Sequence, residues 1–183
     1  MNHTITHTSF KGVYLIESDI FSDNRWDFRE LYHEKAYRAM GIEAKFVQDN
    51  ISVSKKWALR GLHFQKNYPQ SKLIFPLSWS IYDVFVDLRK DSETFGKSEW
   101  FFLRKGNWLF LPKGFAHGFL SLEDDTLVAY KCDDFYHSED EWGIFWDDET
   151  LGIDWKKIFE EYGIDAPIVS EKDKKSPSFF RAS

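Results

Sequence analysis

Cysteine, glycine and proline are scarce in this sequence of 183 residues, which contains 1 Cys, 10 Gly and 5 Pro. The single cysteine, Cys132, excludes an internal disulfide and a zinc site built from cysteines. We interpret Cys132 as a small buried residue rather than as a nucleophile. The low glycine and proline content argues against a linker-rich or disordered chain.

Long apolar runs are also missing, since none approaches the about 18 residues that a membrane-spanning helix needs. Residues 1–10 are polar and lack the basic start and apolar stretch of a secretory signal. The formal net charge of −6 argues against a protein that coats nucleic acid. We therefore expect a cytoplasmic protein, with neither membrane nor nucleic acid as a partner.

Aromatic residues, in contrast, are abundant: 18 Phe, 8 Trp and 8 Tyr make up 19% of the chain. This exceeds what the core of one such domain needs, so some rings are expected to line a cleft or an oligomer interface. The length suits a single domain over residues 1–183.

Short β-rich runs dominate the middle of the chain, and turn residues recur between them at intervals of about 8 to 12 residues. The predicted strands are Phe46–Val53, Ala58–Phe64, Leu73–Leu77, Ile81–Leu88, Glu99–Leu103, Trp108–Leu111, Gly118–Leu122 and Thr126–Cys132. Only two short helices are predicted, Leu31–Met40 and Trp155–Tyr162, each followed by a glycine. This pattern predicts an all-β jelly roll with a few short peripheral helices.

Several polar residues interrupt these strands. In Ile81–Leu88, Asp83 shares a face with Phe85, and an acid facing inward there indicates a wet cavity. Arg60 and His63 are three residues apart, so they point to opposite faces unless a bulge at Gly61 redirects one of them. Buried polar groups cost free energy unless they are partnered, and strands that carry many of them usually line a site.

The spacing Gly106-x5-Pro112-x-Gly114-x2-His117 resembles the second signature of the cupin jelly roll, in which a hairpin turns a histidine into the barrel. The place of the first signature reads Arg60-Gly-Leu-His63-Phe-Gln65. Metal-binding cupins have His-x-His and a following Glu there, whereas this chain keeps one histidine. Two distant imidazoles without a carboxylate are a poor ligand set, so no metal is expected.

A closer resemblance covers residues 12–177. It rests on Phe46-Val-Gln-Asp-Asn50, Leu59-Arg-Gly-Leu-His-Phe-Gln65, Lys72-Leu, Asp83-Val-x-Val-Asp-Leu-Arg89, Pro112-x-Gly-Phe-Ala-His-Gly-Phe119, Tyr130-Lys-Cys and Ser170-Glu-Lys-Asp173. These blocks occur in the order seen in the dTDP-4-dehydrorhamnose 3,5-epimerase family, which the chain therefore resembles. The resemblance implies a cupin that acts on a dTDP-linked 4-keto-6-deoxyhexose without metal or cofactor.

For catalysis, the resemblance implies that His63 is the base that removes a proton beside the ketone. It implies that Asp173 orients this histidine, although the polar tail from Ser170 onward otherwise reads as a solvated end. Tyr130 matches the acid on the opposite face of the sugar, and Lys72 matches the cation beside the enolate oxygen. The C-terminal extension, residues 156–183, is thus expected to contribute Asp173.

For substrate binding, the resemblance implies that Arg25 and Arg60 hold the diphosphate, because a guanidinium group suits phosphate oxygens. The other positions that match the family's pocket are Phe28, Glu30, Gln48, Asn50, His117, Phe135, Tyr136 and Glu141. The family precedent is a homodimer in which an N-terminal strand is exchanged between subunits.

Two segments depart from the family pattern, with Trp26 where glycine is usual and Phe75-Pro-Leu-Ser-Trp79 where a basic turn is usual. Trp26 does not readily adopt a positive φ. These departures leave open which sugar and nucleotide are used and whether both C3 and C5 are inverted. A single-carbon epimerase, a non-catalytic nucleotide-sugar binding module and a metal-dependent cupin are the alternatives.

Overall fold

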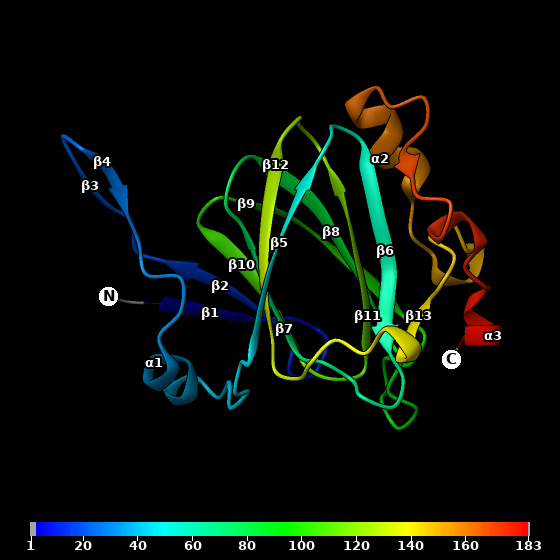
Figure 1. Ribbon diagram of the computed structural model, residues 1–183, viewed down its shortest axis with the longest axis horizontal. Helices are drawn as coiled ribbons and strands as arrows, with labels where there is room; N and C mark the ends of the chain where they lie inside the picture. Colours follow the sequence, from blue (N-terminus) through cyan, green and yellow to red (C-terminus); the bar gives the residue numbers. More distant parts are fainter. Residues whose placement is uncertain (1–2, 183) are drawn as a thin grey trace.

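The computed structural model describes residues 3–182, whose strands form two facing sheets (Figure 1). The first sheet has the strand order β1, β2, β10, β7, β12, β5. Its strands span His3–His7, Tyr14–Ser18, Asn107–Leu111, Lys72–Pro76, Thr126–Cys132 and Gln48–Ser54, respectively. All of its pairings are antiparallel.

The second sheet has the order β13, β6, β11, β8, β9, with β14 paired parallel to β6. These strands span Glu141–Gly143, Ala58–Gln65, Phe115–Ser121, Ser80–Asp87, Ser98–Arg104 and Ile168–Val169. A separate hairpin, β3 (Phe21–Asp23) with β4 (Trp26–Phe28), projects from the body (Figure 1). The α-helices are α1 (Glu34–Ala39), α2 (Trp155–Tyr162) and α3 (Phe179–Ala182), and short 3-10 turns span Ser138–Asp140, Glu149–Leu151 and Asp173–Lys175.

The predicted jelly roll is confirmed. Both ends of each of the eight predicted strands lie within three residues of the ends of an observed strand. Helix α2 has the predicted ends, whereas α1 begins at Glu34 instead of Leu31 because the His33 side chain caps it by accepting the Ala36 N–H. Strands β1 to β4, β13 and β14 and helix α3 were not predicted.

Alternation along β8 divides the apolar residues into two layers. Phe85 packs between the sheets with Ile74, Leu109 and Val128. Val84 lies on the opposite face of the strand, where it belongs to an outer apolar cluster with Trp155, Ile158 and Phe179. The C-terminal segment therefore covers the outside of the second sheet, as Figure 1 shows for the orange and red elements beside β6.

The segment after Ser170, whose polar sequence by itself reads as a solvated end, is packed against the body of the protein. Asp173 is only 4% exposed, and Phe179 and Ala182 are buried in the outer apolar cluster. The sequence did not reveal this burial, because the buried residues of the segment are few and widely spaced and therefore give no periodic hydrophobic pattern.

A bulge lies in β6 where it crosses β11. His117 pairs with His63 and Phe119 pairs with Arg60, so three steps on β6 oppose two on β11. At this crossing, a Cβ on Gly118 would lie 2.5 Å from the Arg60 carbonyl oxygen, and one on Gly61 would lie 2.5 Å from the Gly118 Cα. The two strands approach this closely because both residues are glycine.

Replacing Gly118 with alanine is expected to lower the free energy of unfolding by about 1–3 kcal/mol, because the added methyl group meets backbone on the facing strand. Gly41→Ala is the control, since nothing lies within 4 Å of a Cβ there and only its φ of +89° opposes the change. Chemical denaturation measures both variants. Wild-type stability in Gly118→Ala would contradict this account of the bulge.

Candidate active site

Two adjoining cavities of about 440 Å³ and 370 Å³ lie between the sheets and share His63, Lys72 and Tyr130. We call them together the groove. Its lining includes Gln48, Asn50, Ser52, Arg60, His63, Lys72, His117, Phe119, Tyr130, Glu141, Ser170, Lys172 and Asp173. The bulge at Gly61 explains how Arg60 and His63 reach the same cavity from one strand.

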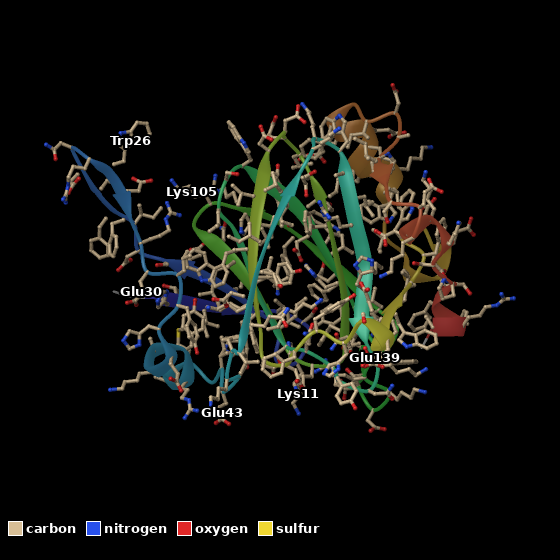
Figure 2. All side chains as sticks on the ribbon, in the orientation of Figure 1. Lys11, Trp26, Glu30, Glu43, Lys105 and Glu139 are labelled. Carbon is tan, nitrogen blue, oxygen red and sulfur yellow. The ribbon has the colours of Figure 1, made fainter. Side chains whose placement is uncertain are left out.

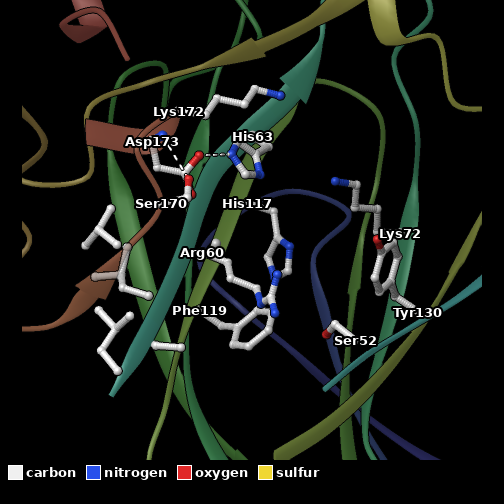
Figure 3. Close-up of a pocket in the computed structure, with 15 residues that line it drawn as sticks. Ser52, Arg60, His63, Lys72, His117, Phe119, Tyr130, Ser170, Lys172 and Asp173 are labelled. Carbon is white, nitrogen blue, oxygen red and sulfur yellow. Dashed lines mark hydrogen bonds and ion pairs between the residues drawn. The ribbon is translucent and has the colours of Figure 1, made fainter. Parts of the chain in front are cut away.

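A short polar contact on the second-sheet side of the groove joins His63 to Asp173, with 2.6 Å between Nε2 and Oδ1 (Figure 3). The other carboxylate oxygen accepts the Gly61 N–H at 3.4 Å, and the Asp173 N–H donates to Ser170 Oγ at 3.1 Å. These contacts hold the carboxylate and the imidazole in one orientation.

The Asp173 carboxyl is ionised at neutral pH. Burial by itself raises its pKa, but the hydrogen bond and charge of His63 and the Gly61 N–H outweigh burial and hold the pKa below the usual range. An ionised carboxylate only accepts hydrogen bonds, so Nε2 of His63 carries the donated proton. The neutral ring then has an unprotonated Nδ1, which is the form that a general base requires.

Tyr130 and Lys72 lie across the groove from His63 (Figure 3). Burial raises the pKa of the Tyr130 phenol, so that it keeps its proton at neutral pH. Burial lowers the pKa of the Lys72 ammonium, while the nearby groups Cys132, Glu141 and Asp83 act in the opposite direction. The structure thus places an acid and a basic side chain opposite a carboxylate-supported imidazole.

A second pairing of carboxylate and imidazole lies on the neighbouring strands β8 and β11. His117 Nε2 is 2.8 Å from Asp83 Oδ2, and the Asp83 side chain is fully buried. This confirms that Asp83 faces inward, as the alternation along β8 predicted.

Arg60 spans the opening between the two sheets. Its Nε donates to Ser54 Oγ at 2.9 Å, and one Nη donates to the Val53 carbonyl at 3.0 Å. Both acceptors lie on or beside β5, so the guanidinium group is held at the open edge of the groove.

Comparison with known proteins places this arrangement in a family. Residues 7–180 match the sequence model of dTDP-4-dehydrorhamnose 3,5-epimerase. The chain belongs to the dTDP-4-dehydrorhamnose 3,5-epimerase family. The predicted resemblance is therefore confirmed.

Individual relatives of the epimerase family align along almost the whole chain. The dTDP-4-dehydrorhamnose 3,5-epimerase of Methanothermobacter thermautotrophicus is 45% identical over 91% of this chain and 89% of its own. The Bacillus anthracis enzyme, solved with TDP and pyrophosphate bound, is 40% identical with a TM-score of 0.90 over 97% of this chain and 100% of that one. The Legionella pneumophila enzyme, solved with dTDP-4-keto-L-rhamnose, is 38% identical with a TM-score of 0.90 over 97% and 93%.

Of the other predicted binding residues, four meet at the second cavity of the groove. Gln48 Nε2 donates to Asn50 Oδ1 at 3.0 Å, and Gln48 Oε1 accepts the Tyr136 N–H at 2.9 Å. The Tyr136 hydroxyl donates to Glu141 Oε2 at 2.7 Å, and the same oxygen accepts a hydrogen bond from Lys172. Phe135 is 60% exposed and does not line either cavity of the groove.

Three more predicted binding residues lie outside the groove. Arg25 and Phe28 belong to the projecting hairpin, where Arg25 pairs with Asp23 at 2.5 Å. Glu30 lies at the base of the hairpin, 3.4 Å from His3 Nε2. Figure 2 shows Trp26 on this arm, away from the two sheets, and Glu30 at its base beside the edge of the first sheet.

Trp26 adopts a φ of 102° in this hairpin, although the sequence analysis expected a tryptophan to avoid positive φ. That expectation is wrong. Trp26 directly follows the two-residue connection between β3 and β4, and tight hairpin connections require residues at positive φ.

Four residues that line the groove, Ser52, Phe119, Ser170 and Lys172, were not among the predicted site residues. Lys172 directly precedes Asp173 in the motif Ser170-Glu-Lys-Asp173, and this adjacency to a predicted catalytic residue could have indicated that Lys172 lines the groove. Cys132 is buried as expected, and burial raises the pKa of its thiol to about 11.

Within residues 3–182, no group of three or more His, Cys, Asp and Glu side chains has the arrangement of a metal site. Over the same residues, no helix is long and apolar enough to cross a membrane.

Asp173→Asn is expected to lower the free energy of unfolding at pH 7 by about 1–3 kcal/mol, because a buried charge-assisted hydrogen bond is lost. Since the folded-state pKa of Asp173 is lowered, its contribution is complete above the ordinary pKa of about 3.9 and disappears as the pH falls through the folded-state value. The stability difference from wild type should therefore shrink as the pH falls below the ordinary value and through the lowered folded-state pKa. Denaturant titrations at several pH values measure it.

Asp165→Asn, at an exposed position in the same segment, is the matched control and should match wild type within about 0.5 kcal/mol. A difference between Asp173→Asn and wild type that grows on acidification would contradict the lowered pKa of Asp173.

Proposed function

We propose that this protein is an epimerase of a nucleotide-linked 4-keto-6-deoxyhexose, converting dTDP-4-dehydro-6-deoxy-D-glucose to dTDP-4-dehydro-L-rhamnose. The observation that carries the proposal is the hydrogen-bonded pair of His63 and Asp173 facing Tyr130 and Lys72 across one groove. Membership in the family and the ligands of its solved relatives support the same substrate class.

In the first step, Nδ1 of His63 removes the proton from a carbon beside the C4 ketone. The C–H electron pair forms a C=C bond, and the carbonyl π electrons move to the oxygen to give an enolate. The imidazole becomes an imidazolium, which the Asp173 carboxylate stabilises through Nε2. The ammonium group of Lys72 balances the new charge on the enolate oxygen.

In the second step, the enolate collapses back to the ketone and the carbon takes a proton from the Tyr130 phenol on the opposite face. The configuration at that carbon is thereby inverted. The phenolate recovers a proton from solvent, and His63 releases the proton that it took. The same cycle at C3 and at C5 accounts for a double inversion.

The groove also suits a nucleoside diphosphate. Arg60, Lys72 and Lys172 give it basic side chains although the chain carries a net charge of −6. A guanidinium group at the mouth matches phosphate oxygens, and His117 adds a hydrogen-bonding group deeper inside. Gln48, Asn50, Tyr136 and Glu141 form a polar end for the nucleoside.

We further propose that the active form is a homodimer with exchanged N-terminal strands. The hairpin carries large exposed apolar side chains, including Phe21, Trp26 and Phe28, which cost free energy in water. Since Arg25 and Phe28 do not reach the groove of their own chain, a partner groove is where they and Glu30 would bind substrate. Phe135, which is exposed and directly precedes Tyr136, would pack against the thymine ring of the nucleotide.

We also propose that the enzyme is cytoplasmic and acts without a metal or cofactor. Elemental analysis tests the last point, since stoichiometric metal that a chelator removes together with activity would contradict it.

Incubation with dTDP-4-dehydro-6-deoxy-D-glucose in D2O is expected to place deuterium at both C3 and C5, because each inversion exchanges a carbon-bound proton for one from solvent. NMR and mass spectrometry measure the incorporation. Deuterium at one carbon would identify a single-carbon epimerase. Binding without any exchange would identify a non-catalytic binding module.

His63→Ala should lower the exchange rate by at least about 100-fold, because it removes the base. Tyr130→Phe should slow net inversion while leaving exchange on the His63 face. His137→Ala is the control, since this histidine does not line the groove and should leave the rate unchanged. Substantial exchange by His63→Ala would exclude His63 as the base.

Arg25→Ala should raise KM by about 10-fold or more with little change in kcat, because one charged phosphate contact is lost. Arg38→Ala, at an exposed position on α1, is the matched control. Light scattering after size-exclusion chromatography reports the oligomeric state. A monomer in solution, or an unchanged KM in a dimeric variant, would contradict the contribution of the hairpin.

A further inference from the structure

Asp83 is a buried acid that the proposed reaction does not use. It lies on the inner face of β8 with no exposed surface. One carboxylate oxygen, Oδ2, is 2.8 Å from His117 Nε2. The other, Oδ1, has no hydrogen-bond partner among residues 3–182.

A buried carboxylate with one unpartnered oxygen is costly unless nearby cations compensate for its lost hydration. Burial raises the pKa of Asp83, and the charges of His117 and Lys72 oppose that rise. Lys72 is in the complementary situation. Burial lowers the pKa of its ammonium, and Asp83 is one of the groups that oppose this change.

The ammonium of Lys72 makes no hydrogen bond or ion pair with any other side chain in the described part of the protein. Its side chain nevertheless lines both cavities of the groove, where the neighbouring acids favour its charged form. Asp83 is the most deeply buried of these acids, since Glu141 is partly exposed.

We propose that Asp83 is a positioning residue, a buried counter-ion that holds His117 by one oxygen and whose negative charge retains Lys72 as an ammonium in the groove. This inference rests on the proposed function, because it assigns Lys72 the enolate oxygen. It deepens that function by identifying what maintains the charge of Lys72 inside the sandwich.

The proposal determines the orientation of His117. An ionised Asp83 only accepts hydrogen bonds, so Nε2 of His117 carries the proton and Nδ1 is free to face the substrate. A neutral Asp83 could instead donate to an unprotonated Nε2, and it would then offer no charge to Lys72. The position of this proton therefore distinguishes the two cases.

The proposal also predicts the alkaline limit of activity. Lys72 supports the enolate only while protonated, so activity falls as the pH rises through its pKa, and removing a neighbouring negative charge moves that fall to lower pH. The other titratable groups that line the groove are Arg60, His63, His117, Tyr130, Cys132, Tyr136, Glu141, Lys172 and Asp173. Of these, the Tyr130 and Tyr136 phenols and the Cys132 thiol also lose protons on the alkaline side.

Asp83→Asn keeps the shape of the side chain and removes the charge. We expect kcat at neutral pH to fall about 10-fold or more, KM to change by less than about 3-fold, and the alkaline limb of kcat to move down by about one pH unit. The same shift should appear in deuterium exchange measured in a Tyr130→Phe background, where the phenol of Tyr130 is absent.

Asp87→Asn is the matched control. Asp87 is equally buried on the same strand but binds Arg89, Ser92 and Thr94. Its loss should lower stability without moving the alkaline limb of the folded enzyme. A folded Asp83→Asn variant with wild-type kcat and an unmoved alkaline limb would overturn the proposal.

A measurement on the wild-type protein covers the case in which Asp83→Asn does not fold. Long-range 1H–15N spectra at pH 7, assigned by loss of the signal in His117→Gln, should show a proton on Nε2 of His117. An unprotonated Nε2 would overturn the proposal. The proposed function fails separately, if the wild-type enzyme exchanges no deuterium, whatever the spectra show.

Discussion

The hydrogen bond between His63 and Asp173 is the interaction on which the site depends, and it joins residues separated by 110 positions in the chain. Its carboxylate comes from a segment with few apolar residues of its own. That segment is held because Trp155, Ile158 and Phe179 bury themselves against the outer face of the second sheet. The apolar layer outside the sandwich thus sets the orientation of an imidazole inside it.

The space between the sheets remains open because part of its wall is polar. Arg60 spans the mouth by binding β5 from β6, which keeps the guanidinium group away from the apolar core. Deeper in, His63 and His117 are paired across β6 and β11, and each imidazole contacts its own carboxylate. Apolar packing by Phe85 and its neighbours begins only beyond this polar layer.

Much of the fold could be predicted because the central strands are rich in branched and aromatic residues and are separated by clear turns. The N-terminal strands gave a weaker signal. Strand β1, with the sequence HTITH, contains one aliphatic residue and relies on pairing with β2 for its place in the sheet. Strand β14 has only two residues and exists because β6 offers it a partner.

The jelly roll, the inward face of Asp83 and the family could be predicted from the amino-acid sequence, because strand periodicity and the order of motifs can be read along the chain. It could not place Asp173 beside His63 on physical grounds, because that contact depends on how a distant segment packs. The direction of Arg60 depended on a bulge that forms only where Gly61 crosses Gly118. The position of Arg25 outside the groove likewise depends on tertiary structure, since the local sequence does not reveal that its hairpin projects away from the two sheets.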